Sequence, residues 1–247
     1  MTDSRLPRYS YLGLPDYMGK AAVHSLAAPT SRVFDMGDEV RPARISHLAL
    51  ATTNFEAVAN WWQTVLNAKP SMAADNMRFM AFDDEHHKVV VFEMAGVAKR
   101  TGPKPEFTGM HHIAFSYESF KDLAATYLRL KQQGIKPWRA INHGTSFALD
   151  YHDPDFNTCE LQCTCFPGSE GEKPELNKWL ATGAFNRNPI GVLFDMDEAI
   201  AAYEAGCGIA DIVSPYVMKV GAHTEEELKT LRMAPVDSDP PDGNCRK

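Results

Sequence analysis

Apolar and polar residues follow the same order in two parts of the chain. Each part begins with a short apolar run, residues 45–51 in the first and residues 110–116 in the second. A stretch with helical spacing comes next in both parts, and short strand-like runs complete them. His47 and His112 are equivalent, since each is the third residue of its opening run. The chain therefore contains an internal repeat of strand, helix and further strands.

Helices are expected where apolar residues recur every three or four positions. In the first repeat these positions run from Phe55 to Leu66, and Asn54 is placed as the N-cap. In the second repeat they run from Phe120 to Leu130, and Gly134 ends the helix. The strands expected after these helices are residues 78–82 and 88–94 in the first repeat, and residues 145–152 and 158–163 in the second.

The repeat also indicates how the chain is divided. Each unit leaves one apolar sheet face open, and pairing the two units would bury both faces. We expect an N-terminal arm over residues 1–44, a first module over 45–105 and a second over 106–166. Residues 167–247 are expected to form a helical extension and a tail. Its expected helices are residues 174–181, 196–205 and 224–232, before a polar, proline-rich end at 237–244.

Composition excludes several classes of partner. The 247-residue chain carries a net charge of −7, which argues against binding a nucleic-acid polyanion. No run is apolar and long enough for a membrane helix, and the first residues lack the pattern of a secretory signal. Five sparse cysteines indicate reduced thiols. These features predict a cytoplasmic protein without nucleic acid or membrane as partner.

Three residues of the repeat form a candidate metal site. His47 and His112 open the two units, and Glu160 lies on a strand that closes the second. Two imidazoles and one carboxylate delivered from rigid strands make a facial triad that suits Fe(II) and leaves positions open for other ligands. A lone histidine at the head of a strand is more often structural, but the equivalence of His47 and His112 favours a metal site.

Three segments on this repeat resemble the vicinal oxygen chelate superfamily: residues 45–50, 110–115 and 153–161. Within it, the chain is most similar to the type I extradiol ring-cleaving dioxygenases, whose last motif usually reads DPDGNxxEL. The likeness implies an α+β fold in which paired βαβββ modules form an open β-barrel around one metal. Phe156 replaces the usual glycine of the motif, so the loop needs a turn conformation that a side-chain residue accepts.

The resemblance also implies which histidines act. Aligned on the repeat, His112 matches His47, so His112 points inward and His111 outward by strand alternation. His143 precedes Glu160 by 17 positions, where relatives often carry a histidine that reaches the substrate. Its near-neutral pKa would let it take a proton from a catechol hydroxyl and return one later. A turn histidine without chemistry is the alternative for His143.

The chain departs from the family at one catalytic position. Ring-cleaving relatives commonly place a tyrosine ten positions before the glutamate ligand, but here that residue is Asp150 and the tyrosine is Tyr151. Strand alternation sends these two side chains to opposite faces. Either a bulge restores Tyr151 to the site, or Asp150 faces the site as an acid.

Glu93 distinguishes two ligand sets. His47 and Glu93 are 46 positions apart, and His112 and Glu160 are 48 apart, so spacing aligns the two glutamates. A site with all four residues would resemble glyoxalase I, a lyase that needs Ni(II) or Zn(II). The residues before Glu93 instead look like the non-metal module of small extradiol enzymes, which favours the three-ligand set.

The expected function is an Fe(II)-dependent dioxygenase that opens the ring of a catechol-like aromatic diol with O2, with Mn, Ni or Zn as alternative metals. A non-oxidative metal enzyme of the same superfamily, such as a lyase, isomerase or epimerase, is the second candidate. A metal-free protein that sequesters a small molecule is the third. The helices after residue 170 are expected either to cover or extend the barrel, or to form the interface of a homodimer or higher homo-oligomer.

Overall fold

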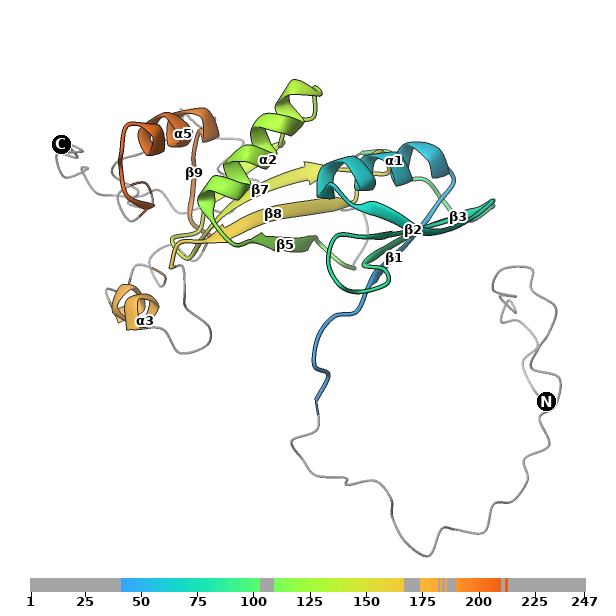
Figure 1. Ribbon diagram of the computed structural model, residues 1–247, viewed down its shortest axis with the longest axis horizontal. Coiled ribbons are helices and arrows are strands. Elements are labelled where there is room, and N and C mark those ends of the chain that lie inside the picture. Colours follow the sequence, from blue (N-terminus) through green and yellow to red (C-terminus); the bar gives the residue numbers. More distant parts are fainter. Residues whose placement is uncertain are drawn as a thin grey trace, which may run out of the picture.

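The computed structural model describes residues 41–102, 109–166, 174–181, 183, 185, 190–209 and 212. Figure 1 shows their arrangement. Most of the expected N-terminal arm lies outside the described residues, as do the expected helix at 224–232 and the polar end at 237–244.

The first repeat folds as one strand, one helix and three strands. Its sheet has the order β1-β4-β3-β2, in which β1 and β4 are parallel and the other neighbours are antiparallel. The elements are β1 (Leu48–Thr52), α1 (Phe55–Leu66), β2 (Lys69–Ala74), β3 (Met77–Ala81) and β4 (Val89–Glu93).

The second repeat has the same topology with one strand added. Its sheet has the order β5-β8-β7-β6-β9, and β9 comes from the C-terminal extension. The elements are β5 (Ile113–Tyr117), α2 (Phe120–Gln132), β6 (Arg139–Asn142), β7 (Ser146–His152), β8 (Thr158–Thr164) and β9 (Val192–Leu193). The expected α+β fold with paired βαβββ modules is confirmed. The described strands form two hydrogen-bonded sheets, one in each module.

The hydrophobic core lies between the sheets and the two helices, which contact each other above the strands (Figure 1). Trp62 of α1 and Leu123 of α2 are fully buried there. Helix α1 begins after Asn54 as expected, although the Asn54 side chain makes no capping hydrogen bond. Helix α2 ends before Gly134, whose φ of 77° is in the left-handed region that glycine tolerates.

Polar contacts join the two modules as well. The Trp62 indole donates to Asp153 in the turn between β7 and β8, with an Nε1–Oδ2 distance of 2.9 Å. The Arg129 guanidinium of α2 donates to the carbonyl of Thr64 in the last turn of α1 at 2.7 Å. These bonds pair polar groups of one module with partners from the other, so polar as well as apolar contacts cross the interface between the modules.

The described part of the C-terminal extension contains two of the expected helices, α3 (Pro174–Ala181) and α5 (Met196–Glu204). Phe194 and Met196 join the core. Cys207 is disulfide-bonded, so the expectation of reduced thiols is wrong at that position. No helix among the described residues is long and apolar enough to span a membrane.

Candidate metal and substrate site

The second sheet has one face covered by α2 and one face that carries polar side chains. Tyr151 of β7 and Cys159 of β8 are paired and belong to the core. The next pair, Asp150 and Glu160, therefore points to the opposite face, because side chains alternate along a strand. Registered pairs across β5, β8, β7 and β6 place four residues in one row on this open face: Ala114, Glu160, Asp150 and Arg139.

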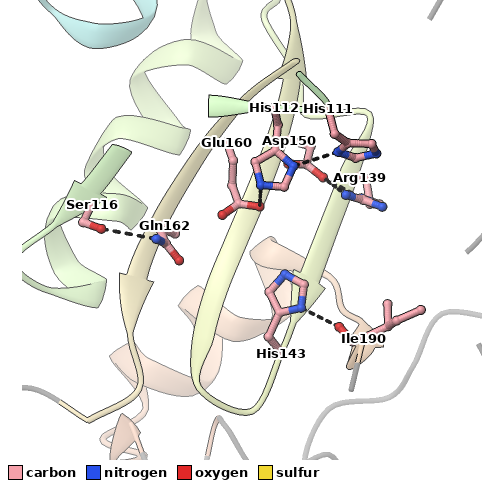
Figure 2. A network of polar contacts seen from close by, with 9 residues as sticks. All are labelled: His111, His112, Ser116, Arg139, His143, Asp150, Glu160, Gln162 and Ile190. Carbon is pink, nitrogen blue, oxygen red and sulfur yellow. Dashed lines mark hydrogen bonds and ion pairs between the residues drawn. The ribbon is translucent and has the colours of Figure 1, made fainter. Parts of the chain in front are cut away.

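His112 lies beside Glu160 on the same face. It precedes β5 by one residue, and its Nε2 is 3.8 Å from Oε2 of Glu160 (Figure 2). The other ring nitrogen, Nδ1, is 2.8 Å from Nδ1 of His111. If Nε2 binds a metal, the proton of His112 is on Nδ1 and is donated to His111, which fixes the tautomer and the ring orientation. The structure thus places His112, and not its neighbour, next to the carboxylate.

His47 occupies the equivalent position in the first module, directly before β1, and is exposed. Its ring centroid is 4.7 Å from that of His87. Within the described residues, no three His, Cys, Asp or Glu side chains lie close enough together to hold a metal ion. The structure therefore brings His112 and Glu160 together and leaves His47 against His87.

The strand register identifies the counterpart of Glu160 in the first module. Leu48 pairs with Val89 where Ile113 pairs with Cys159, so Val90 is equivalent to Glu160. Spacing alone had aligned Glu93 with Glu160. Glu93 pairs with Thr52 instead, on the opposite face of the first sheet from Val90, and is exposed. An apolar side chain thus stands where a four-ligand set would need its second carboxylate.

Asp150 and Tyr151 lie on opposite faces of the second sheet, Asp150 on the face of Glu160 and Tyr151 on the face of the core. The register of β7 and β8 is continuous from Ser146 to His152, so no bulge reverses the alternation. Tyr151 is 1% exposed, in the core with Tyr127, and its hydroxyl makes no hydrogen bond to another residue that the structure describes. Tyr151 therefore lies on the core side of β7, and Asp150 lies on the side that carries Glu160. Burial raises its pKa further above the usual value of a phenol.

Arg139 holds Asp150 in place. Nε of Arg139 is 2.5 Å from Oδ2 of Asp150, and Nη2 contacts the same oxygen. Sequence reasoning missed Arg139, which precedes Asp150 by 11 positions. The sequence could indicate Arg139 only through the alternation of side chains along the hairpin of β6 and β7. The alternation places Arg139 opposite Asp150 only once the register of the hairpin is known.

His143 lies at the end of β6, and the C-terminal extension fixes its ring. Nδ1 of His143 is 2.5 Å from the carbonyl oxygen of Ile190 (Figure 2). A carbonyl can only accept, so Nδ1 carries the proton and Nε2 is left as an acceptor. Strand β9 pairs with β6 and brings Ile190 to this position. A Cβ on Gly191 would lie 2.1 Å from the carbonyl oxygen of Asn142, so only glycine allows this approach.

Charge and burial act together on Glu160. Burial raises the pKa of its carboxyl, the nearby Asp150 raises it further, and His143 and Arg139 lower it. A cation bound beside this group would favour the ionised carboxylate and repay the cost of burying it. Burial and the neighbouring His112 lower the pKa of His111, which favours the neutral ring that can accept from His112.

The residues fit a divalent metal by their chemistry. His112 and Glu160 are an imidazole and a buried carboxylate on one sheet face, and a second imidazole, that of His143, is near enough to lower the pKa of Glu160. Imidazole and carboxylate together are typical ligands of Fe(II), Mn(II) and Zn(II). His47 would complete the set from the equivalent strand of the first module.

The turn between β7 and β8 differs from a glycine-containing turn. Phe156 has a φ of 62°, in the left-handed region that residues with side chains rarely adopt. Its ring centroid lies 6.3 Å from that of His152, and His152 stacks on Trp138 at 5.0 Å. The turn therefore accepts Phe156 with the conformation expected for glycine and gains an aromatic contact next to the open face.

Comparisons with known proteins identify the family of the chain and two relatives. Residues 44–161 match the family described as the Glyoxalase/Bleomycin resistance protein/Dioxygenase superfamily. The chain is 34% identical over 172 residues to biphenyl-2,3-diol 1,2-dioxygenase 2 of Rhodococcus globerulus, across 69% of this chain and 87% of that relative. It is 33% identical over 165 residues to biphenyl-2,3-diol 1,2-dioxygenase 3 of the same organism, across 66% of this chain and 83% of that relative.

Solved structures with a similar fold have lower identity. A glyoxalase/dioxygenase from Nostoc punctiforme is 16% identical, covers 54% of this chain and 97% of its own, and has a TM-score of 0.43. A lactoylglutathione lyase from Agrobacterium tumefaciens is 16% identical, covers 49% of this chain and 94% of its own, and has a TM-score of 0.40. Likeness at this level does not distinguish one activity from another.

Proposed function

Since the chain belongs to the glyoxalase/bleomycin resistance protein/dioxygenase superfamily, we propose that it is an Fe(II)-dependent extradiol-type dioxygenase. Its substrates would be O2 and a catechol-like aromatic diol, whose ring it opens. Two relatives in the superfamily are named as dioxygenases of biphenyl-2,3-diol, which supports an aromatic diol as substrate.

The ligand set is the observation that carries this proposal. His112 and Glu160 lie together on the open face of the second sheet, and Val90 occupies the equivalent place in the first module. We propose that His47, His112 and Glu160 bind the metal, with one carboxylate and two neutral imidazoles. Such a set leaves coordination positions for both hydroxyls of a diol and for O2.

The metal and the protein would have separate tasks. Bound Fe(II) would hold the diol and O2 at one centre and lower the pKa of the diol hydroxyls. His143 would accept a proton from one hydroxyl at Nε2, because its Nδ1 proton is engaged by the Ile190 carbonyl. The fixed ring keeps that acceptor in one orientation, which reduces the entropy lost at the reaction step.

Val90 argues against the lyase alternative. A four-ligand site of the glyoxalase I type needs a second carboxylate at the position that Val90 occupies, and Glu93 points from the opposite sheet face. An isopropyl group cannot ligate a metal. We therefore do not propose a lyase for this chain.

Reconstitution tests the proposal. The protein is purified without oxygen, its metal content is measured, and Fe(II) is added before a panel of catechols. We expect oxygen uptake together with the yellow colour of ring-cleaved products, and neither in Glu160→Ala. Tight Ni(II) or Zn(II) occupancy without oxygen uptake for any diol would contradict the proposal, as would metal-free binding of an aromatic ligand that His47→Ala does not change.

A further inference from the structure

A buried ion pair lies in the middle of the open sheet face. Asp150 is 1% exposed, and the Arg139 side chain is 13% exposed. The pair continues the row that contains Glu160, so it is adjacent to the carboxylate proposed as a metal ligand. A charged pair withdrawn from water at this place needs a reason, because equally well-packed apolar residues would be at least as stable.

One oxygen of Asp150 makes no hydrogen bond within the described part of the chain. Arg139 contacts Oδ2 through both Nε and Nη2, whereas Oδ1 is buried and makes no hydrogen bond to any described residue. A buried acceptor without a hydrogen bond is costly, and such groups in folded proteins commonly await a ligand or a water. Oδ1 therefore provides a preformed acceptor for a hydrogen-bond donor on a bound molecule.

Arg139, in contrast, is already engaged. Two of its nitrogens contact Asp150, and its guanidinium carbon is 4.7 Å from the ring centroid of Trp138. Trp138 is itself stacked on His152, with an angle of 7° between the rings. These contacts hold the guanidinium beside Asp150. An anionic group on a bound molecule would have to compete with Asp150 for the same cation, and would meet a carboxylate as its nearest polar neighbour.

We propose that Asp150 and Arg139 determine specificity, by selecting diols whose ring substituents are uncharged and rejecting those that carry a carboxylate. The inference rests on the proposed function, since it names the substrate class of that same site. Asp150 accepts a hydrogen bond from a neutral donor of the bound molecule, such as a hydroxyl. Arg139 positions Asp150 and balances its charge beside Glu160.

A matched pair of diols tests this selection. 4-Methylcatechol and protocatechuate carry a methyl group and a carboxylate at the same ring position. Affinity is measured by equilibrium dialysis against the Zn(II)-loaded protein without oxygen, which requires no turnover, and kcat/KM is measured with Fe(II). We expect the wild-type protein to prefer methylcatechol at least about tenfold in both measurements, because a second carboxylate beside Asp150 is repelled.

The two partners should shift the preference in different ways. Asp150→Asn removes the negative charge and frees Arg139 to bind a carboxylate, so the ratio should move at least about tenfold toward protocatechuate. Arg139→Gln removes the cation and keeps the acceptor, so the preference for methylcatechol should stay or increase. Glu93→Gln removes a carboxylate outside the site and should leave the ratio unchanged. Thermal unfolding shows whether each variant is folded. Asp150→Asn decides the test, because the proposal requires its ratio to move, whereas Arg139→Gln is expected not to shift toward protocatechuate.

The outcomes separate this inference from the proposed function. A charge-dependent affinity ratio without oxygen uptake would uphold the selection and contradict the dioxygenase. Oxygen uptake with an affinity ratio that stays within about twofold of the wild-type ratio in folded Asp150→Asn would overturn the selection. A shift toward protocatechuate in both variants would also overturn it, because that result indicates a loosened site and not a charge effect.

Discussion

Individual side chains decide which of the two glutamates can serve a metal. Glu160 is buried beside His112, whereas Glu93 is exposed at the end of β4. Spacing could not separate them, because a difference of two positions between the repeats leaves the strand register free. The register of β7 and β8 contains no bulge, so the simple alternation of side chains along β7 places Asp150 on the open face.

Replacing Glu160 and Glu93 in turn tests which of the two glutamates binds the metal. Mutating a residue that hydrogen-bonds to a metal ligand typically lowers metal affinity by roughly 10- to 100-fold. We expect Glu160→Ala, which removes a proposed ligand itself, to lower the affinity for Fe(II) by more than that. Glu93→Ala should retain the wild-type metal content, because the Glu93 side chain lies on the face of the first sheet opposite to that of Val90, the counterpart of Glu160. Metal content after dialysis, measured by elemental analysis, checks both. Equal retention by the two variants would remove Glu160 from the ligand set.

His152 should make stability depend on pH. Burial lowers its pKa from 6.5 in the folded chain, so between that lowered value and 6.5 the unfolded chain binds more protons. The stabilising contribution of the neutral ring is thus complete above pH 6.5 and is lost as the pH falls through the lowered value. His152→Gln cannot titrate and provides the reference.

The measurement is the free energy of unfolding of both proteins in urea between about pH 5 and 8. The advantage of the wild-type protein over His152→Gln should shrink toward acid pH. A difference that stays constant over this range would show that the ring titrates alike in the folded and unfolded chain.

At the scale of elements, the repeat predicted both helices and most strands, but not β2, β6 or β9. Strand β2 is exposed along its whole length, so it lacks the apolar alternation that marks a half-buried strand. Strand β9 has two residues and exists through its pairing with β6. The contact from Ile190 to His143 depends on β9, and no local pattern in the sequence could have indicated it.

Gly191 tests whether this added strand supports the site. A Cβ there would overlap the carbonyl oxygen of Asn142 at 2.1 Å, and φ is 98°. Gly191→Ala should displace the Ile190 carbonyl from His143, lower kcat, and destabilise the fold by more than about 1–3 kcal/mol. Gly206→Ala is the control, since φ is also positive there but nothing lies within 4 Å.

Steady-state kinetics and thermal unfolding of the two variants give the comparison. Gly206→Ala should show backbone strain alone, of about 1–2 kcal/mol, with kcat unchanged. If Gly191→Ala keeps the wild-type kcat, then β9 does not position His143.

At the scale of the whole molecule, the two modules share one core and one set of polar contacts. The sequence predicted that neither module is stable alone, because each repeat leaves an apolar face open. It could not show that Trp62 of the first module donates to Asp153 of the second. These residues are 91 positions apart, one on a helix and the other in a turn, and no periodic pattern relates such a pair.

Trp62→Phe tests the coupling of the modules. It keeps an aromatic ring and removes the donor, so Asp153 loses a buried hydrogen bond across the interface. We expect a loss of about 1.5–3 kcal/mol in the free energy of unfolding, in a single transition. Trp61→Phe is the matched control, because the Trp61 ring is only partly buried, and it should cost less. Two separate transitions in urea would mean that the modules fold independently.

The fate of molecular oxygen tests the central claim most directly. The Fe(II)-loaded protein is given a catechol under labelled O2, and the product is analysed by mass spectrometry. A ring-cleaving dioxygenase built on His112 and Glu160 predicts a product that contains both labelled oxygen atoms, and no such product from Glu160→Ala. An unlabelled product, or an unchanged diol with no oxygen consumed, would contradict the account.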